Sequence, residues 1–299
     1  MNAEAEGRAA AARFREEHRL GVQPLGDLVA VIEQATGIDV AVLDAGPDEH
    51  GLTMRDPVRE TVFVGVARTR NPMRQRSTLA HELGHVQFED WADTEDWADT
   101  EDCADTDAGN WSDRSGVEVR ADAFARHLLL PADGLRDLLG TRELVTPSTL
   151  SAVVQRFLVS PAIAAIALQQ AGYVDVVTKT AWMALTTPQL ASRFGWSDQY
   201  HALQADSNRR RAPQRLLARA IKGYAEGVLS AQAIATMRGI ALEAAEAELR
   251  EAGVVPAKRP VAWADPAELP NVEVDWAALD EDLDAPDNHQ GKAAETEAQ

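Results

Sequence analysis

The chain has 299 residues, 45% of them hydrophobic, and a formal net charge of −19 at pH 7. This length allows a sizeable core and predicts two domains, or one domain with an appendage. The single cysteine, Cys103, excludes an internal disulfide and is typical of a reducing compartment. No apolar run is long enough to cross a bilayer, and the charged N-terminus lacks the apolar centre of a signal peptide. We therefore expect a cytoplasmic protein without a membrane partner.

The first half of the chain predicts two helices and a small sheet. Apolar periodicity and β-rich composition place helices at residues 9–19 and 25–36 and strands at 38–43, 51–54 and 60–68. The last strand carries Val62, Val64 and Val66 on one face and leads directly into the next helix. An edge of this sheet could bind an extended peptide as a further strand, or the strand could only pack beneath that helix.

The motif with the clearest chemistry is His-Glu-Leu-Gly-His, which begins at His81. Asn71 can cap the helix that carries it, and Pro72 suits its first turn. Histidines four residues apart leave the same face of a helix, so His81 and His85 can bind one cation, and zinc suits two imidazoles. Glu82 can accept a proton from a metal-bound water. The alternative is a pair of histidines on an amphipathic helix that binds no metal.

Three tandem acidic hexads, EDWADT, EDWADT and EDCADT, follow this helix. Residues 89–107 contain ten acidic and no basic residues, and residues 256–299 contain eleven acidic and three basic ones. These two segments hold almost all of the net charge, so the rest of the chain is near neutral. The hexads predict a disordered insertion, or a lid in which Trp91 and Trp97 dock in an apolar cleft. Residues 256–299 predict a disordered acidic tail.

A second helix is predicted at residues 118–130, ended by Pro131. A catalytic zinc normally has three protein ligands, and Glu118 at the start of this helix is a candidate for the third. Asp122 lies four residues further on the same face, where it could accept the other ring N–H of a ligating histidine. His127 points in roughly the opposite direction, so we interpret it as structural.

Two linked motifs resemble the ImmA/IrrE family of metallo-endopeptidases, over a segment from about residue 9 to about residue 174. They are NPMRQRSTLAHELGH at residues 71–85 and E-x-x-A-D-x-F-A-x-x-L-L-x-P at residues 118–131. The resemblance implies zinc bound by His81, His85 and Glu118, with Glu82 as the catalytic base. It also implies an α+β, zincin-like fold and, as substrate, a helix-turn-helix transcriptional repressor of a stress or mobile-element response. The acidic hexads lengthen the interval between the two motifs, as an insertion in a loop would.

The C-terminal half predicts two helix-turn-helix-like units, at residues 146–175 and 229–255. The two could be a weak duplication or a coincidence between alanine-rich helices. Neither has the polar residues that a recognition helix needs at its start, so we expect both to pack on protein. A basic run at Arg209, Arg210 and Arg211 could contact nucleic-acid phosphates or pair with the acidic groups of the protein itself.

We therefore predict a zinc metallopeptidase domain over residues 1–140 with the acidic insertion at 89–107. A helical, helix-turn-helix-like region over residues 141–255 and the acidic tail over 256–299 follow it. The function that these features favour is a zinc-dependent endopeptidase. The alternative is a regulatory factor that binds protein or DNA and has a structural or vestigial metal site. The intact Glu82 argues against this alternative, because a structural site has no need of a base.

Overall fold

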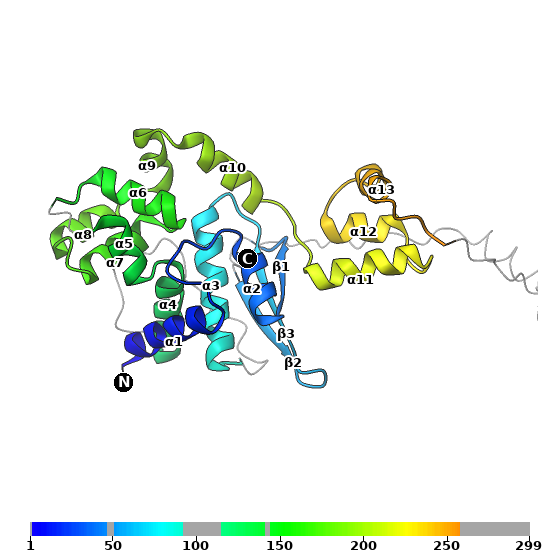
Figure 1. Ribbon diagram of the computed structural model, residues 1–299, viewed down its shortest axis with the longest axis horizontal. Coiled ribbons are helices and arrows are strands. Elements are labelled where there is room, and N and C mark those ends of the chain that lie inside the picture. The colour runs from blue at the N-terminus through cyan, green and yellow to red at the C-terminus, as the bar shows by residue number, and fades with distance from the viewer. Residues whose placement is uncertain (1, 47–50, 92–114, 141–143, 258–299) are drawn as a thin grey trace, which may run out of the picture. The chain divides into compact units, whose positions relative to one another are not determined.

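The computed structural model describes residues 2–46, 51–91, 115–140 and 144–257. Most of the acidic hexads, with Trp97 and Cys103, and all but the first two residues of the predicted tail lie outside these residues. The elements are α1 (Ala3–Glu17), α2 (Leu28–Thr36), β1 (Asp39–Leu43), β2 (Gly51–Asp56), β3 (Thr61–Ala67), α3 (Pro72–Phe88), α4 (Gly116–Leu129), α5 (Ala132–Leu139), α6 (Pro147–Phe157), α7 (Pro161–Gln170), α8 (Val176–Met183), α9 (Thr187–Phe194), α10 (Ser197–Ser207), α11 (Gln214–Ala225), α12 (Ala231–Arg238) and α13 (Leu242–Glu251). The chain is thus α+β, as predicted (Figure 1).

The sheet has the strand order β1-β3-β2. β3 pairs in parallel with β1 and antiparallel with β2, so both of its edges are occupied. Val64 and Val66 are buried on one face of β3, as the alternation predicts. β3 therefore packs beneath α3 rather than offering an edge to a partner. Any peptide that joins this sheet has to use an outer strand, β1 or β2.

Capping side chains set the starts of the N-terminal helices. The side chain of Asn2 accepts a hydrogen bond from the amide of Ala5, so α1 begins at Ala3 and not at residue 9. Asp27 accepts from the amide of Ala30, so α2 begins at Leu28 and not at residue 25. The predicted helices were displaced because apolar periodicity does not reveal which polar side chain forms the cap.

Helix α3 lies between the sheet and α4 (Figure 1). Asn71 caps it by accepting from the amide of Arg74, and Pro72 occupies its first turn, as predicted. Gly84 lets α3 and α4 approach closely, because a Cβ there would be 3.1 Å from the Cα of Ala121. Phe124 of α4 is fully buried in the core beside this contact. The short interhelical distance brings the first turn of α4 against the histidines of α3.

Helices α6 and α7 form the predicted helix-turn-helix-like pair and bend by 111°. Ser160 caps α7 by accepting from the amide of Ile163. Ala164 and Ala165, in the first turns of α7, are fully buried in the main core, so they cannot reach a DNA groove. The core includes residues from both sides of residue 140, and Met1–Ala257 form one compact unit. Among the described residues, no single helix combines the length and apolar composition of a membrane span.

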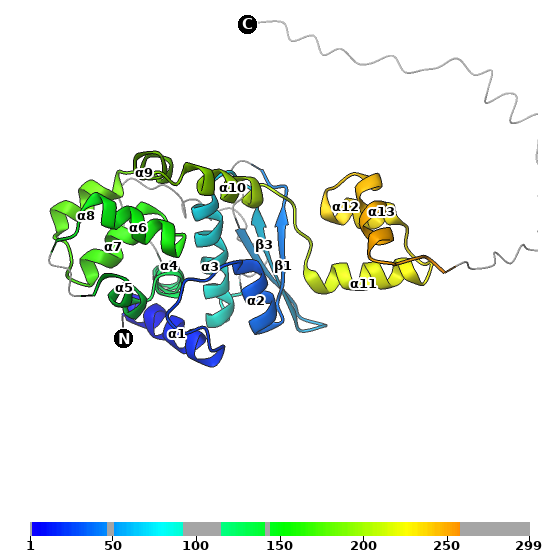
Figure 2. The ribbon, with the colours of Figure 1, turned by 45° about the horizontal axis from the view of Figure 1, so that its top comes forward.

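Helices α11, α12 and α13 enclose a second, smaller buried cluster that includes Ala220, Ile234 and Leu249 (Figure 2). The segment before α11 forms an isolated antiparallel bridge with β1, between Arg211 and Val42. Basic side chains of this segment and of the first turn of α11 form ion pairs with acidic groups near the sheet: Arg210 with Asp44, Arg211 with Asp27, and Arg215 with Asp39.

Glu4 links α1 to α4 and predicts a pH dependence of stability. Its carboxylate accepts from His127 and pairs with Arg126, and these contacts lower the pKa of Glu4 from 4.5 to about 2. Because the folded pKa is the lower one, the stabilisation is present above pH 4.5 and is lost as the pH falls toward 2. We expect Glu4→Gln to lower the free energy of unfolding at pH 6, with a difference from wild type that shrinks below pH 4. Denaturant titrations measure this, and Glu17→Gln on the same helix is the control.

Candidate metal centre

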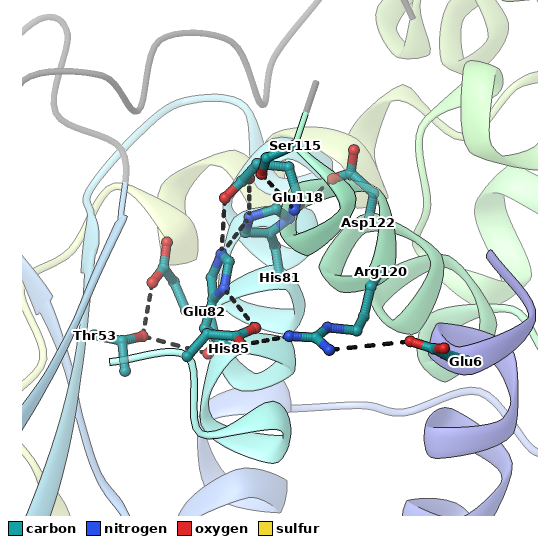
Figure 3. A network of polar contacts seen from close by, with 10 residues as sticks. Glu6, Thr53, His81, Glu82, His85, Ser115, Glu118, Arg120 and Asp122 are labelled. Carbon is teal, nitrogen blue, oxygen red and sulfur yellow. Dashed lines mark hydrogen bonds and ion pairs between the residues drawn. The ribbon is translucent and has the colours of Figure 1, made fainter. Parts of the chain in front are cut away.

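Three side chains from α3 and α4 converge at one point (Figure 3). The Nε2 atoms of His81 and His85 are 3.0 Å apart, and Glu118 Oε2 lies 3.1 Å from His81 Nε2. Glu118 Oε1 lies 3.6 Å from His85 Nε2. One ligand atom from each residue lies within 4.8 Å of the others, which is close enough for a shared metal ion. The structure therefore brings together the three residues that the sequence singled out as ligands.

The chemistry of these donors fits a divalent cation. Two imidazole nitrogens and a carboxylate oxygen are a ligand set that zinc accepts in catalytic sites. The hydrogen bond from His81 is the main cause that lowers the pKa of Glu118 and keeps this carboxylate charged. Of the three ligands, His81 is buried, whereas His85 and Glu118 are partly exposed.

Acidic groups also lie beside the outer nitrogens of the two imidazoles. Asp122 Oδ1 lies 2.9 Å from His81 Nδ1, the arrangement expected from the sequence. Asp90 Oδ2 lies 3.5 Å from His85 Nδ1, and Arg120 binds the other oxygen of Asp90 at 2.5 Å. A carboxylate on the far nitrogen orients the ring and makes the near nitrogen a better ligand.

Sequence reasoning missed Asp90, because it counted this residue among the acids of the hexad insertion. Glu89 adopts the left-handed conformation at the end of α3, and this turns Asp90 back toward the helix. The amide of Asp90 then donates to the carbonyl of His85. Trp91, which the alternative of a lid would dock in an apolar cleft, lies with its ring 5.5 Å from the guanidinium of Arg55 on β2. The available signal was position: Asp90 directly follows the residue that ends α3, although it is also the second residue of the first hexad.

Glu82 lies on the side of the site that faces the sheet. The residue is 8% exposed, and its Oε2 accepts a hydrogen bond of 2.7 Å from the hydroxyl of Thr53 on β2 (Figure 3). A hydroxyl that donates to the carboxylate holds it in one rotamer and leaves Oε1 for another partner. Thr53 was not predicted, because its contact depends on how the sheet packs against α3.

The comparisons with known proteins agree with this geometry. Residues 33–169 match the family model described as the IrrE N-terminal-like domain of peptidase family M78. This segment belongs to the ImmA/IrrE metallopeptidase family. No curated protein matches the chain. The ImmA/IrrE segment contains all three candidate ligands, Glu82 and both acids on the outer nitrogens, so the family supports a metallopeptidase with its metal at this cluster.

A substitution at Gly51 tests the role of Glu82 and leaves the three candidate metal ligands unchanged. A Cβ at Gly51 would lie 2.7 Å from Glu82 Oε1 and 2.6 Å from a methyl group of Thr78. Gly51→Ala should therefore displace the Glu82 carboxylate and lower kcat by about tenfold or more, since small misplacements of catalytic groups have large effects. Metal content should stay at the wild-type value. Gly116→Ala, where no atom lies within 4 Å of the added methyl, is the control.

Proposed function

We propose that the chain is a zinc-dependent endopeptidase with a zincin-like active site. The observation that supports this is the convergence of His81, His85 and Glu118, with Glu82 between the two histidines in sequence. Zinc bound there would lower the pKa of its water to about 7 and polarise the scissile carbonyl. The Asp122 and Asp90 carboxylates would hold the two imidazoles in the tautomers that ligation requires.

Glu82 acts as the general base in this proposal. Its carboxylate accepts the proton of the attacking water and later delivers it to the leaving amine. Thr53 holds one carboxylate oxygen, so proton transfer uses the other. Because Glu82 is buried, little bulk water competes for that oxygen.

The substrate would lie along β2, the outer strand on the Glu82 side of the sheet. β2 pairs with β3 through one edge, and Thr53 connects the strand to the catalytic base. An extended peptide could add to the other edge, so that main-chain hydrogen bonds hold it next to the metal. Such binding is largely independent of side chains, which suits cleavage of an exposed, unfolded segment.

We propose a helix-turn-helix repressor as the natural substrate, on the strength of the family resemblance. The test is to incubate the zinc-loaded protein with any helix-turn-helix repressor that is encoded near its gene, and with casein. Discrete repressor fragments that disappear with a metal chelator support the proposal. Cleavage of casein without cleavage of the repressor would support the peptidase activity and reject the repressor as its substrate. Cleavage of neither would favour the regulatory alternative, in which the metal site is structural.

The basic run does not strengthen a nucleic-acid role. Arg210 and Arg211 are engaged with Asp44 and Asp27, so their charges are partly neutralised within the protein. Contact between these arginines and DNA remains a proposal, and its test is a salt-dependent shift of duplex DNA.

A further inference from the structure

A cavity of about 680 Å³ lies away from the metal centre, and none of the metal-site residues lines it. Its walls come mainly from α2, the first half of α3, the end of α10, the segment between α10 and α11, and the end of α12. The volume is within the range of about 300–1,000 Å³ that small-molecule sites have. Arg76 and Leu79 of α3 line the cavity, whereas the ligands His81 and His85, further along the same helix, do not.

The cavity is basic, although the chain as a whole is strongly acidic. Five arginines line it, against two acidic residues, Asp27 and Asp206: Arg76, Arg209, Arg210, Arg211 and Arg238. Three of these arginines form ion pairs with Asp44, Asp27 and Glu248. In the described part of the chain, no carboxylate lies within ion-pair distance of Arg76 or Arg209. These two arginines have no direct ion pair, although Asp27 attracts Arg76 and Glu248 interacts with Arg209 at longer range.

Arg76 is fixed in place without losing its charge. Its guanidinium donates to the carbonyl oxygens of Leu25 and Gly26, both at 2.6 Å, and to that of Leu158 at 3.2 Å. Burial lowers the pKa of Arg76 only to about 10, so it is charged at neutral pH. A charged group that is held by neutral carbonyls can still attract an anion.

The N-terminus of α2 also lines the cavity, over residues 26–30. The helix dipole and the first amides make such an end attractive to anions, and Asp27 already uses the amide of Ala30. Asp27 also pairs with Arg211, so it occupies one side of the site. The N-terminus of α2, Arg76 and Arg209 thus line the same half-open cavity.

We propose that this cavity binds a small phosphate-bearing molecule. Phosphate oxygens suit planar guanidinium groups and helix N-termini, and several arginines around one cavity can hold more than one phosphate. A duplex is the less suitable ligand, because Arg76 lines a concave site that a rigid double helix cannot enter. Free polyphosphate and a nucleotide share this chemistry, and the test separates them.

The test is isothermal titration calorimetry on the full-length protein at 150 mM salt, with pyrophosphate and with ADP as probes. We expect wild type to bind at least one probe, and Arg209→Ala to weaken binding by about 10- to 100-fold, as loss of a charge-assisted hydrogen bond does. Gln34→Glu, which places a negative charge in the lining at constant size, should weaken it similarly. Arg250→Ala, outside the lining, should bind as wild type does. Thermal melts of each variant confirm folding.

Each outcome decides the proposal. Tighter binding of ADP than of pyrophosphate assigns a nucleotide, and equal binding assigns the phosphates alone. Absence of binding by wild type at millimolar probe overturns the proposal, as does equal weakening in Arg250→Ala, which would indicate unspecific charge attraction. Duplex DNA binding that Arg209→Ala abolishes, without binding of either probe, would assign the arginines to nucleic acid. None of these results depends on peptidase activity.

Discussion

Glu82→Gln is expected to lower the rate of peptide hydrolysis by about 100- to 10,000-fold, the usual contribution of a general base. Glutamine has nearly the same shape and can still bind the Thr53 hydroxyl, but it cannot take up a proton. The variant should therefore keep its fold and its metal and lose kcat. Cleavage of casein or of the repressor, followed with metal content by mass spectrometry, measures both quantities on one preparation.

The control for this prediction is Thr53→Val, which removes the hydrogen bond to Glu82 and leaves the base itself. We expect its kcat to fall less than that of Glu82→Gln, because the carboxylate is only less well oriented. Wild-type activity in Glu82→Gln would contradict the assignment of the base. Loss of metal from the same variant would instead show that Glu82 contributes to binding.

Glu118→Ala is expected to weaken metal binding by more than about 100-fold, since it removes one ligand of three. The protein should purify with little zinc, whereas wild type should hold about one ion per chain. Two histidines alone bind a cation weakly, and the carboxylate also neutralises part of its charge. Competition with a chromogenic chelator measures the affinity, and mass spectrometry measures the content.

Asp122→Asn gives the graded comparison for this prediction. Loss of a carboxylate on the outer nitrogen of a ligand typically costs about 10- to 100-fold in affinity, so this variant should lie between wild type and Glu118→Ala. Glu89→Gln, an exposed acid beside the site, should bind as wild type does. Unchanged affinity in Glu118→Ala would show that the third ligand is another residue.

Local sequence was sufficient to predict a feature wherever the contacts that form it lie within one helix or turn. The interval between His81 and His85 places both rings on one face of a helix, because helical geometry alone decides it. The cap at Asn71 and the turn at Ser160 are local in the same way. The displaced starts of α1 and α2 show the limit of this rule, since several polar residues there could have served as caps.

The parts of the site that join distant segments were harder to predict. Glu118 was a candidate only because it opens the second predicted helix and belongs to the linked motif, and its contact with His81 requires the close α3–α4 approach at Gly84. Thr53 reaches Glu82 only because β2 pairs beside β3 under α3. The cavity beside α2 combines residues more than a hundred positions apart in the sequence, and no local sequence pattern predicted it.

The sequence by itself determined the α+β class, the family, and the two histidines and the glutamate that belong to one helix. Tertiary structure alone decided that Asp90 lies beside His85, that Thr53 donates a hydrogen bond to Glu82, and that arginines gather around a separate cavity. The physical reason is that a helical repeat fixes neighbours over one or two turns. Contacts between elements depend instead on packing, which the whole core sets at once.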